Sequence, residues 1–283
     1  MRRGQRIAAA LCGIVPPVLT PLTPQERVDA PGLKRLLRHL VSNGVDGLFL
    51  LGSSGEAFAL PAPERSRVVE IAADAAGDAL PVLAGVSAES TLRAAQNAKD
   101  LYKAGARVAV STIPYYIRLG RAEVVEHFKV LADLSPMPVM IYSHPLTGFV
   151  IDLDLYRELS AIPNMIGAKD TYGNPRSFQQ VAAWCRSNRM FRLFQGSEFQ
   201  MAVSVMWGAA GCVPAIANII PGLCSDLYAA AVRNDAQQAL ALQQKVTDIS
   251  NALFGARFPS SFFCGLKYAL RCMGICGETA SKP

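Results

Sequence analysis

The sequence predicts an α/β fold, a TIM (β/α)8 barrel with a C-terminal helical extension. Over the first 233 of its 283 residues, short apolar runs alternate eight times with longer amphipathic runs. The apolar runs are continuous, as expected for parallel strands that are covered on both faces. Eight strand–helix units of this kind favour a closed barrel over an open doubly wound sheet.

Each unit begins with an apolar run of strand length, such as "GLFLLG" or "LPVLAGV". In chain order the predicted strands are 13–20, 47–52, 80–86, 106–112, 137–143, 165–170, 191–196 and 211–215. Asn43-Gly44 ends the first amphipathic run, and Pro63 and Pro221 stand where helices should begin. The predicted helices are 30–43, 63–76, 90–104, 122–134, 152–160, 175–187, 198–207 and 221–232.

Beyond the eighth unit the pattern is helical only, with helices predicted over 235–253 and 259–273. No linker rich in Pro, Gly or Ser separates this part from the rest. We therefore expect a barrel over residues 1–233 and a C-terminal helical extension over residues 234–283 that packs on it.

The composition is that of an ordinary globular protein, with 51% apolar residues and a net charge of +6. No basic stripe with interleaved aromatic residues is present, so no nucleic-acid partner is expected, while a mildly positive protein suits a small anionic substrate. Pro16 and Pro17 interrupt a signal-like start, and no run of about 18 apolar residues predicts a membrane span. The seven cysteines are expected to be free thiols, and the protein to be cytoplasmic.

The active site of such a barrel forms at the carboxyl ends of its strands, so the polar residues there are the candidates. The sixth strand ends at Lys169, the fifth carries Tyr142, and Ser53 and Ser54 follow the second. Burial disfavours the charged form of an amine, and a neutral amine condenses with a carbonyl to form a Schiff base. A nearby tyrosine can move the protons, and hydroxyls beside glycine amides suit a carboxylate. No convergent His, Asp and Glu set predicts a metal site.

Four motifs carry a resemblance to a known family: "GSSGE", "PYY", "YSHPLTG" and "GAKD", in this order along the chain. They resemble the pyruvate-dependent class I lyases typified by dihydrodipicolinate synthase and N-acetylneuraminate lyase, from about residue 12 to beyond residue 270. The resemblance implies a covalent imine between lysine and substrate, with no other cofactor. It also implies a homotetramer built as a dimer of dimers.

The resemblance also implies roles for individual residues. Lys169 matches the lysine that forms the Schiff base, and Tyr142 matches the tyrosine that shuttles protons. Gly52, with Ser53 and Ser54, matches the segment that binds the carboxylate and relays protons. Tyr116 matches an aromatic residue that, in the synthase branch, reaches into the site of a neighbouring subunit.

The sequence departs from the synthase pattern beyond the fifth strand. Thr147 stands where that branch has an arginine for the carboxylate of its second substrate, so "YSHPLTG" looks more like the lyase and 2-keto-3-deoxy sugar acid aldolase branch. His144 is unusual there, and it is either an acid, base or hydroxyl-binding group or a structural histidine. Glu198 resembles a sugar-hydroxyl contact, but Ala215, after Pro214, replaces an expected polar residue, which argues against a fully hydroxylated sugar.

We therefore expect a Schiff-base-forming class I lyase or aldolase acting on a 2-oxo acid, by a reaction like that of 2-keto-3-deoxy acid aldolases. The nearest alternative is a dehydratase or hydratase-aldolase that uses the same lysine imine. A 4-hydroxy-tetrahydrodipicolinate synthase is disfavoured by Thr147, and a non-catalytic 2-oxo acid sensor is disfavoured by the complete set of lysine, tyrosine and serines.

Overall fold

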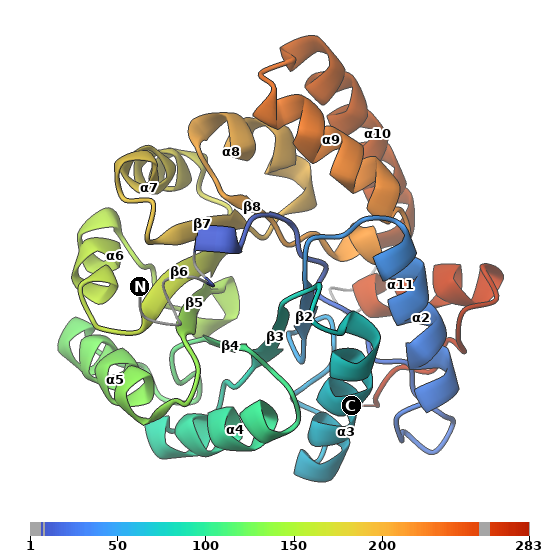
Figure 1. The fold of residues 1–283 in the computed structure, drawn as a ribbon, viewed down its shortest axis with the longest axis horizontal. Coiled ribbons are helices and arrows are strands. Elements are labelled where there is room, and N and C mark those ends of the chain that lie inside the picture. The colour runs from blue at the N-terminus through green and yellow to red at the C-terminus, as the bar shows by residue number, and fades with distance from the viewer. Residues whose placement is uncertain (1–6, 8, 255–260, 283) are drawn as a thin grey trace.

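The computed structural model describes residue 7, residues 9–254 and residues 261–282. Eight parallel strands surround a central axis and helices form a ring outside them (Figure 1), so the predicted TIM barrel is confirmed. The strands are β1 (Gly13–Ile14), β2 (Leu48–Leu50), β3 (Val82–Gly85), β4 (Val108–Ser111), β5 (Val139–Ser143), β6 (Met165–Asp170), β7 (Arg192–Gln195) and β8 (Gly211–Cys212).

Hydrogen-bonded neighbours run in the order β1-β8-β7-β6-β5-β4-β3-β2. The segment after β1 closes the ring against β2, because Pro17 bridges to Phe49 in parallel and the Val18 amide donates to the Phe49 carbonyl at 2.8 Å. β1 is shorter than the predicted 13–20, since Pro16 and Pro17 have no N–H to donate to a ladder. The eighth strand also ends early, and Ala215 instead opens the 3-10 turn Ala215–Asn218.

The helices match the predicted ones to within one residue at most ends. They are α2 (Ala30–Ser42), α3 (Ala62–Ala76), α4 (Thr91–Lys103), α5 (Arg121–Leu134), α6 (Leu153–Ser160), α7 (Pro175–Ser187), α8 (Met201–Trp207), α9 (Pro221–Val232), α10 (Ala236–Phe254) and α11 (Ser261–Cys272). A 3-10 turn, Glu198–Gln200, precedes α8 where one continuous helix was expected. The predicted start of the last helix, 259–260, lies outside the described residues.

Short polar side chains begin several helices. Asp29 accepts the Gly32 amide at the start of α2, and Asp152 accepts the Leu155 amide at 2.7 Å at the start of α6. Such caps satisfy amides that have no partner within the helix. They fix where α2 and α6 begin.

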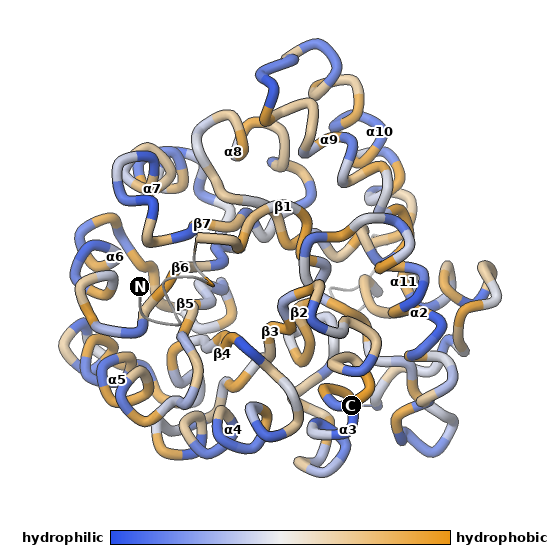
Figure 2. Tube along the Cα trace, in the orientation of Figure 1, coloured by the Kyte–Doolittle hydropathy of each residue, from blue (hydrophilic) through white to orange (hydrophobic). Residues whose placement is uncertain are grey.

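Two apolar clusters divide the interior. The larger lies between strands and helices, and the smaller fills the barrel with one or two side chains from most strands, among them Phe49, Val110, Met140 and Phe194. Figure 2 shows the strands as largely hydrophobic and the surrounding helices as alternating between hydrophobic and hydrophilic stretches. Tyr142 belongs to the inner cluster, so its side chain points into the barrel.

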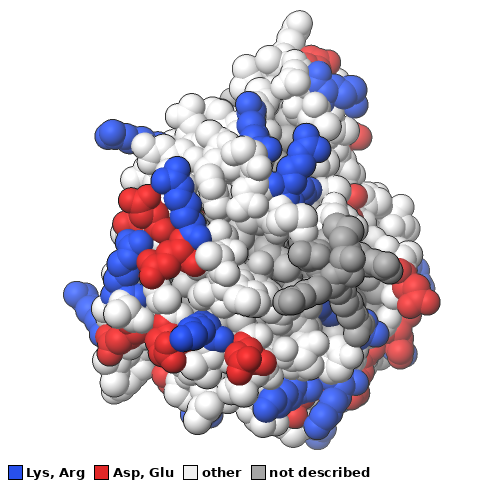
Figure 3. All heavy atoms as spheres, turned by 60° about the vertical axis from the view of Figure 1, so that its left-hand side comes forward, with Lys and Arg blue, Asp and Glu red and all other residues white. Residues whose placement is uncertain are grey.

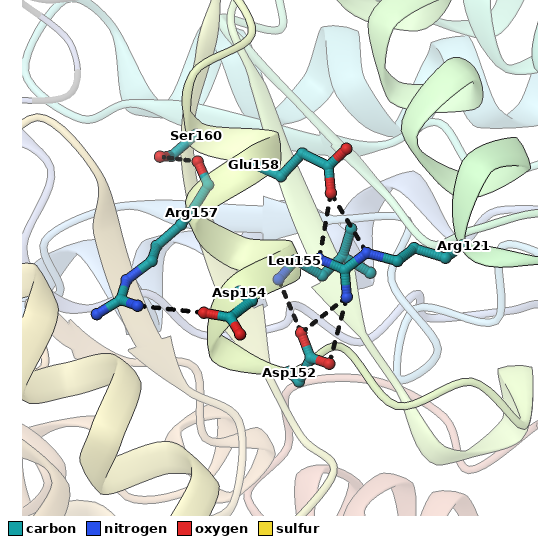
Figure 4. Close-up of polar contacts among 7 residues, drawn as sticks. All are labelled: Arg121, Asp152, Asp154, Leu155, Arg157, Glu158 and Ser160. Carbon is teal, nitrogen blue, oxygen red and sulfur yellow. Dashed lines mark hydrogen bonds and ion pairs between the residues drawn. The ribbon is translucent and has the colours of Figure 1, made fainter.

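Charged residues of both signs are interspersed over the face drawn in Figure 3. Between α5 and α6, Arg121 contacts Asp152 at 3.3 Å and Glu158 at 3.1 Å, and Arg157 pairs with Asp154 (Figure 4). These side chains are about half exposed, and such pairs typically contribute only about 0–1 kcal/mol each. The network therefore adds little to the stability of the fold.

The C-terminal helices lie outside the ring, where α10 packs against both α9 and α11 (Figure 1). Within the described residues, no helix combines the length and the apolar character that crossing a bilayer requires. All seven cysteines are free thiols.

Candidate active site

Lys169 and Tyr142 meet at the carboxyl end of neighbouring strands. Their Cα positions are direct partners in the β5–β6 ladder, so both side chains point into the barrel. The Lys169 ammonium donates to the Tyr142 hydroxyl at 3.3 Å and lies 4.3 Å from the centroid of that ring. Both residues are buried, at 5% and 6% exposure. A buried amine in contact with a phenol is the arrangement that imine chemistry requires.

The next residue on the strand points the other way. The Asp170 carboxylate accepts hydrogen bonds from the Tyr156 hydroxyl at 3.2 Å and from the Tyr172 amide at 2.8 Å. Burial raises the pKa of Asp170, and these hydrogen bonds oppose the rise. Asp170 is thus an anchor for the strand end and is directed away from the amine.

The loop after β2 brings hydroxyls to the same place. The Ser53 hydroxyl lies 3.5 Å from the Tyr142 hydroxyl, which connects it to Lys169 through one atom. The loop can approach β3 closely because residue 85 is glycine: a Cβ there would lie 1.9 Å from the Leu51 carbonyl oxygen. Packing between β2 and β3 therefore sets the position of Ser53.

A cavity of about 460 Å³ opens over these residues. Of the predicted site residues, Gly52, Ser53, Tyr142, His144 and Thr147 line it. The volume lies within the usual range of about 300–1,000 Å³ for small-molecule sites. Lys169 itself does not line the cavity, but its amine contacts the hydroxyl of Tyr142, which does.

His144 stands beside Tyr142 at the cavity wall. The two rings meet edge to face with centroids 5.1 Å apart. Burial, helped by the charge of Lys169, lowers the pKa of His144 to about 4. Its Nδ1 accepts the Leu146 amide at 3.2 Å, so the neutral ring carries its hydrogen on Nε2. His144 can therefore donate a hydrogen bond at neutral pH.

Besides Lys169 and Tyr116, three predicted residues do not line this cavity. Ser54 is buried, and the Glu198 carboxylate accepts the Ala215 amide at 2.5 Å and the Ile216 amide at 3.4 Å. Burial is also the main cause of a raised pKa at Glu198, although the nearby charge of Lys169 opposes it. Glu198 and Ala215 are thus bound to each other where the sequence suggested separate substrate contacts.

Two more predicted residues have exposed or partly exposed positions. Tyr116 is 85% exposed and does not line the cavity. The Thr147 hydroxyl lines it but donates to the His144 carbonyl at 2.8 Å, which closes the turn after β5. Thr147 therefore presents a short side chain where a guanidinium would reach across the cavity.

Sequence reasoning missed one side of the cavity. Arg65 on α3, Arg93 on α4 and Glu89 line it, and Glu89 accepts a hydrogen bond from the Tyr115 hydroxyl at 3.3 Å. Glu89 and Arg93 are four residues apart just after the third strand and pair at 3.3 Å. The spacing of Glu89 and Arg93 can be read from the sequence, but the sequence does not show that their side chains face the loop after β2.

Within the part of the chain that the structure describes, no three His, Cys, Asp or Glu side chains are placed to hold a metal ion. The polar groups that meet around Tyr142 are an amine, a hydroxyl and one neutral imidazole, and two guanidinium groups and a carboxylate line another side of the cavity.

Comparison with known proteins agrees with this arrangement and assigns its class. A dihydrodipicolinate synthase structure from Bacteroides thetaiotaomicron is 34% identical, covering 96% of this chain and 92% of that chain, with a TM-score of 0.92. YagE, a prophage protein of the dihydrodipicolinic acid synthase family from E. coli K12, solved with pyruvate, is 28% identical over 96% and 92% of the two chains, with a TM-score of 0.90. A 4-hydroxy-tetrahydrodipicolinate synthase from Syntrophus aciditrophicus is 30% identical over 272 residues, 96% of this chain and 91% of the relative.

The barrel and these relatives define an enzyme of the class I lyase type, in which a lysine forms a Schiff base with the substrate. The chain belongs to the dihydrodipicolinate synthetase family, whose model matches residues 10–283. The family resemblance expected from the four motifs is thereby confirmed.

Proposed function

We propose that this enzyme is an aldolase-type lyase for a 2-oxo acid, with a reaction like that of 2-keto-3-deoxy acid aldolases. The observation that carries the proposal is the buried contact between the Lys169 amine and the hydroxyl of Tyr142, a residue that lines the cavity. The structure of YagE with pyruvate supports a 2-oxo acid as the ligand class.

In the proposed reaction, the Lys169 nitrogen adds to the ketone carbon and water leaves, giving an iminium. Tyr142 supplies the proton that makes the oxygen a leaving group, and Ser53 lies within reach to pass protons onward. The iminium accepts the electron pair of the C3–C4 bond as the Tyr142 phenolate takes the proton of the substrate's 4-hydroxyl, which releases an aldehyde and leaves an enamine. Protonation at C3 and hydrolysis then release pyruvate and free the amine.

The remaining groups are assigned by their positions. Gly52 and Ser53, which line the cavity, hold the carboxylate with amides and a hydroxyl, and the buried Ser54 supports them from the next position of the loop. His144 donates its Nε2 hydrogen to a substrate oxygen beyond the ketone. Thr147 leaves room at the position where a second carboxylate would need a cation, which disfavours 4-hydroxy-tetrahydrodipicolinate synthesis.

A dehydratase or hydratase-aldolase is the second candidate, and His144 is the observation that favours it. A hydrogen-bond donor beside the imine could help to expel a 4-hydroxyl as water, starting from the same intermediate. The chemistry before that step is identical, so only the products distinguish the two.

Borohydride reduction in the presence of pyruvate, followed by intact mass measurement, tests the imine. We expect one stable adduct per chain, absent from Lys169→Ala and retained in a control, Lys103→Ala, which removes an exposed lysine on α4. An adduct in Lys169→Ala, or none in the unmodified enzyme, would refute the assignment. Product analysis with a panel of 2-oxo acids and aldehydes then separates aldolase from dehydratase.

We also propose a homotetramer built as a dimer of dimers, with a cytoplasmic location. The exposed Tyr116 ring supports a subunit contact, because an interface would remove its large apolar surface from water. Sedimentation velocity at micromolar concentration is expected to give a tetramer, and a monomer would contradict this part.

A further inference from the structure

A buried ion pair ties the carboxylate-binding loop to the C-terminal extension. Glu56, the last residue of "GSSGE", pairs with Lys267 of α11, and these side chains are only 2% and 0% exposed. The Lys267 amine also donates to the Thr279 carbonyl at 2.7 Å. Ser281 donates to the other Glu56 oxygen from both its amide, at 2.6 Å, and its hydroxyl, at 2.7 Å.

This contact joins parts of the chain that are more than 200 residues apart in sequence. Figure 1 shows α11 on the side of the barrel that carries α2 and α3, and the hydrogen bonds from Ser281 to Glu56 bring the C-terminal segment to the loop that follows β2. The Glu56 carboxylate is therefore held by groups from a helix and from the segment that follows it.

The loop has a backbone that needs such support. Leu51 and Glu56 flank it with φ angles of 56° and 53°, a left-handed conformation that non-glycine residues seldom adopt. Residues persist there only where their surroundings impose it. The Thr20 hydroxyl holds the Gly55 carbonyl at 2.7 Å, and the Glu56 side chain supplies the other fixed point.

Stability alone does not require this pair. Removing two charges from water is costly, and a well-packed apolar pair of similar volume often serves the fold as well or better. An ion pair differs from an apolar pair in fixing direction, since the carboxylate must face three donors at once. Its position, two residues beyond Ser54, is where a directional constraint would act on the substrate carboxylate.

We infer that Lys267, assisted by Ser281, is a positioning residue. By holding the Glu56 side chain, it keeps the 52–56 loop in the conformation that binds the substrate carboxylate. This inference rests on the proposed function for the role of the loop. It assigns the C-terminal extension a part in substrate affinity, although none of its residues named here lines the cavity.

The test compares pyruvate with methyl pyruvate, which keeps the ketone but lacks the carboxylate. In Lys267→Met, we expect the pyruvate concentration for half-maximal borohydride trapping to rise about tenfold or more, because small displacements of binding groups have large effects. The concentration for methyl pyruvate should stay unchanged. Ser281→Ala should raise the half-maximal concentration of pyruvate by a smaller factor, again without changing that of methyl pyruvate. If Lys267→Met does not fold, Ser281→Ala tests the inference by itself.

Lys282→Met is the matched control, since Lys282 is exposed, lies in the same segment and pairs only at 3.8 Å with Glu26. Equal shifts for both ketones, or pyruvate curves that superimpose on the unmodified enzyme, would overturn the inference. Hydrogen exchange of the 51–60 amides gives a readout that is independent of the imine. Faster exchange in the Lys267 and Ser281 variants, but not in the control, is expected, and unchanged exchange would overturn the inference even if the proposed reaction failed.

Discussion

The protonation state of His144 offers a direct test of how the site is built. Burial and the neighbouring Lys169 charge lower the pKa of His144 from 6.5 to about 4. At about pH 5.5, an imidazole with the ordinary pKa would be about 90% protonated, and one with a pKa of about 4 would be about 3% protonated. We therefore predict that His144 stays neutral, and keeps donating from Nε2, across the range in which histidines normally titrate.

NMR titration of the three histidine rings measures this, with His144→Gln to identify the resonance. We expect the His144 shifts to stay nearly constant from about pH 8 to about pH 5. Replacement of Lys169 by Met removes a positive charge close to the ring, and should raise the pKa of His144. A rise in this variant would identify the amine as a contributor, whereas burial alone predicts no change.

Activity provides the second half of the test. If His144 acts as a hydrogen-bond donor, His144→Ala should lower kcat/KM by about 10- to 100-fold, and His144→Gln should restore part of it because an amide also donates. A wild-type ring that titrates near 6.5, or an alanine variant with unchanged rates, would refute the reasoning for this residue.

Two further predictions concern single groups. Tyr142→Phe removes the hydroxyl in contact with Lys169 but keeps the ring against Phe49, so kcat should fall by about 100-fold or more while the unfolding midpoint barely moves; a loss below tenfold would contradict the proton-shuttle role. His127 is 3% exposed, and burial lowers its pKa to about 4. Between about pH 6.5 and pH 4 the unfolded chain therefore binds more protons than the folded one. The free energy of unfolding should fall by up to about 3 kcal/mol as the pH drops through that window. Urea denaturation at several pH values should show a flatter dependence in His127→Gln, and parallel curves for the two proteins would exclude His127 as the cause.

Much of the fold could be predicted from the sequence because local signals agreed with the tertiary structure. Pro63 and Pro221 stand in the first turns of α3 and α9, as predicted, and the apolar runs became strands that are buried on both faces. The errors lie where a local pattern met a backbone constraint. The apolar run 13–20 was predicted as one strand, but Pro16 and Pro17 cannot donate to a ladder, so only Gly13–Ile14 pairs regularly.

The candidate site could be predicted where it depends on which face of a strand a side chain occupies. Tyr142 and Lys169 end neighbouring strands, and direct pairing in the ladder places their side chains on the same face. Glu198 could not be placed this way, because its carboxylate is bound by amides of a turn after β8. Arg65 and Arg93 also escaped prediction, since they reach the cavity from two helices whose rotation follows from packing.

The sequence by itself determined the barrel, the family and the amine, since each depends on patterns within a strand, a helix or a short motif. Only the tertiary structure decided what surrounds that amine. Burial beside Lys169 keeps His144 neutral, and Lys267 comes from the far end of the chain to hold Glu56. Charge states and long-range contacts depend on desolvation and distance, and neither quantity exists until the chain has folded.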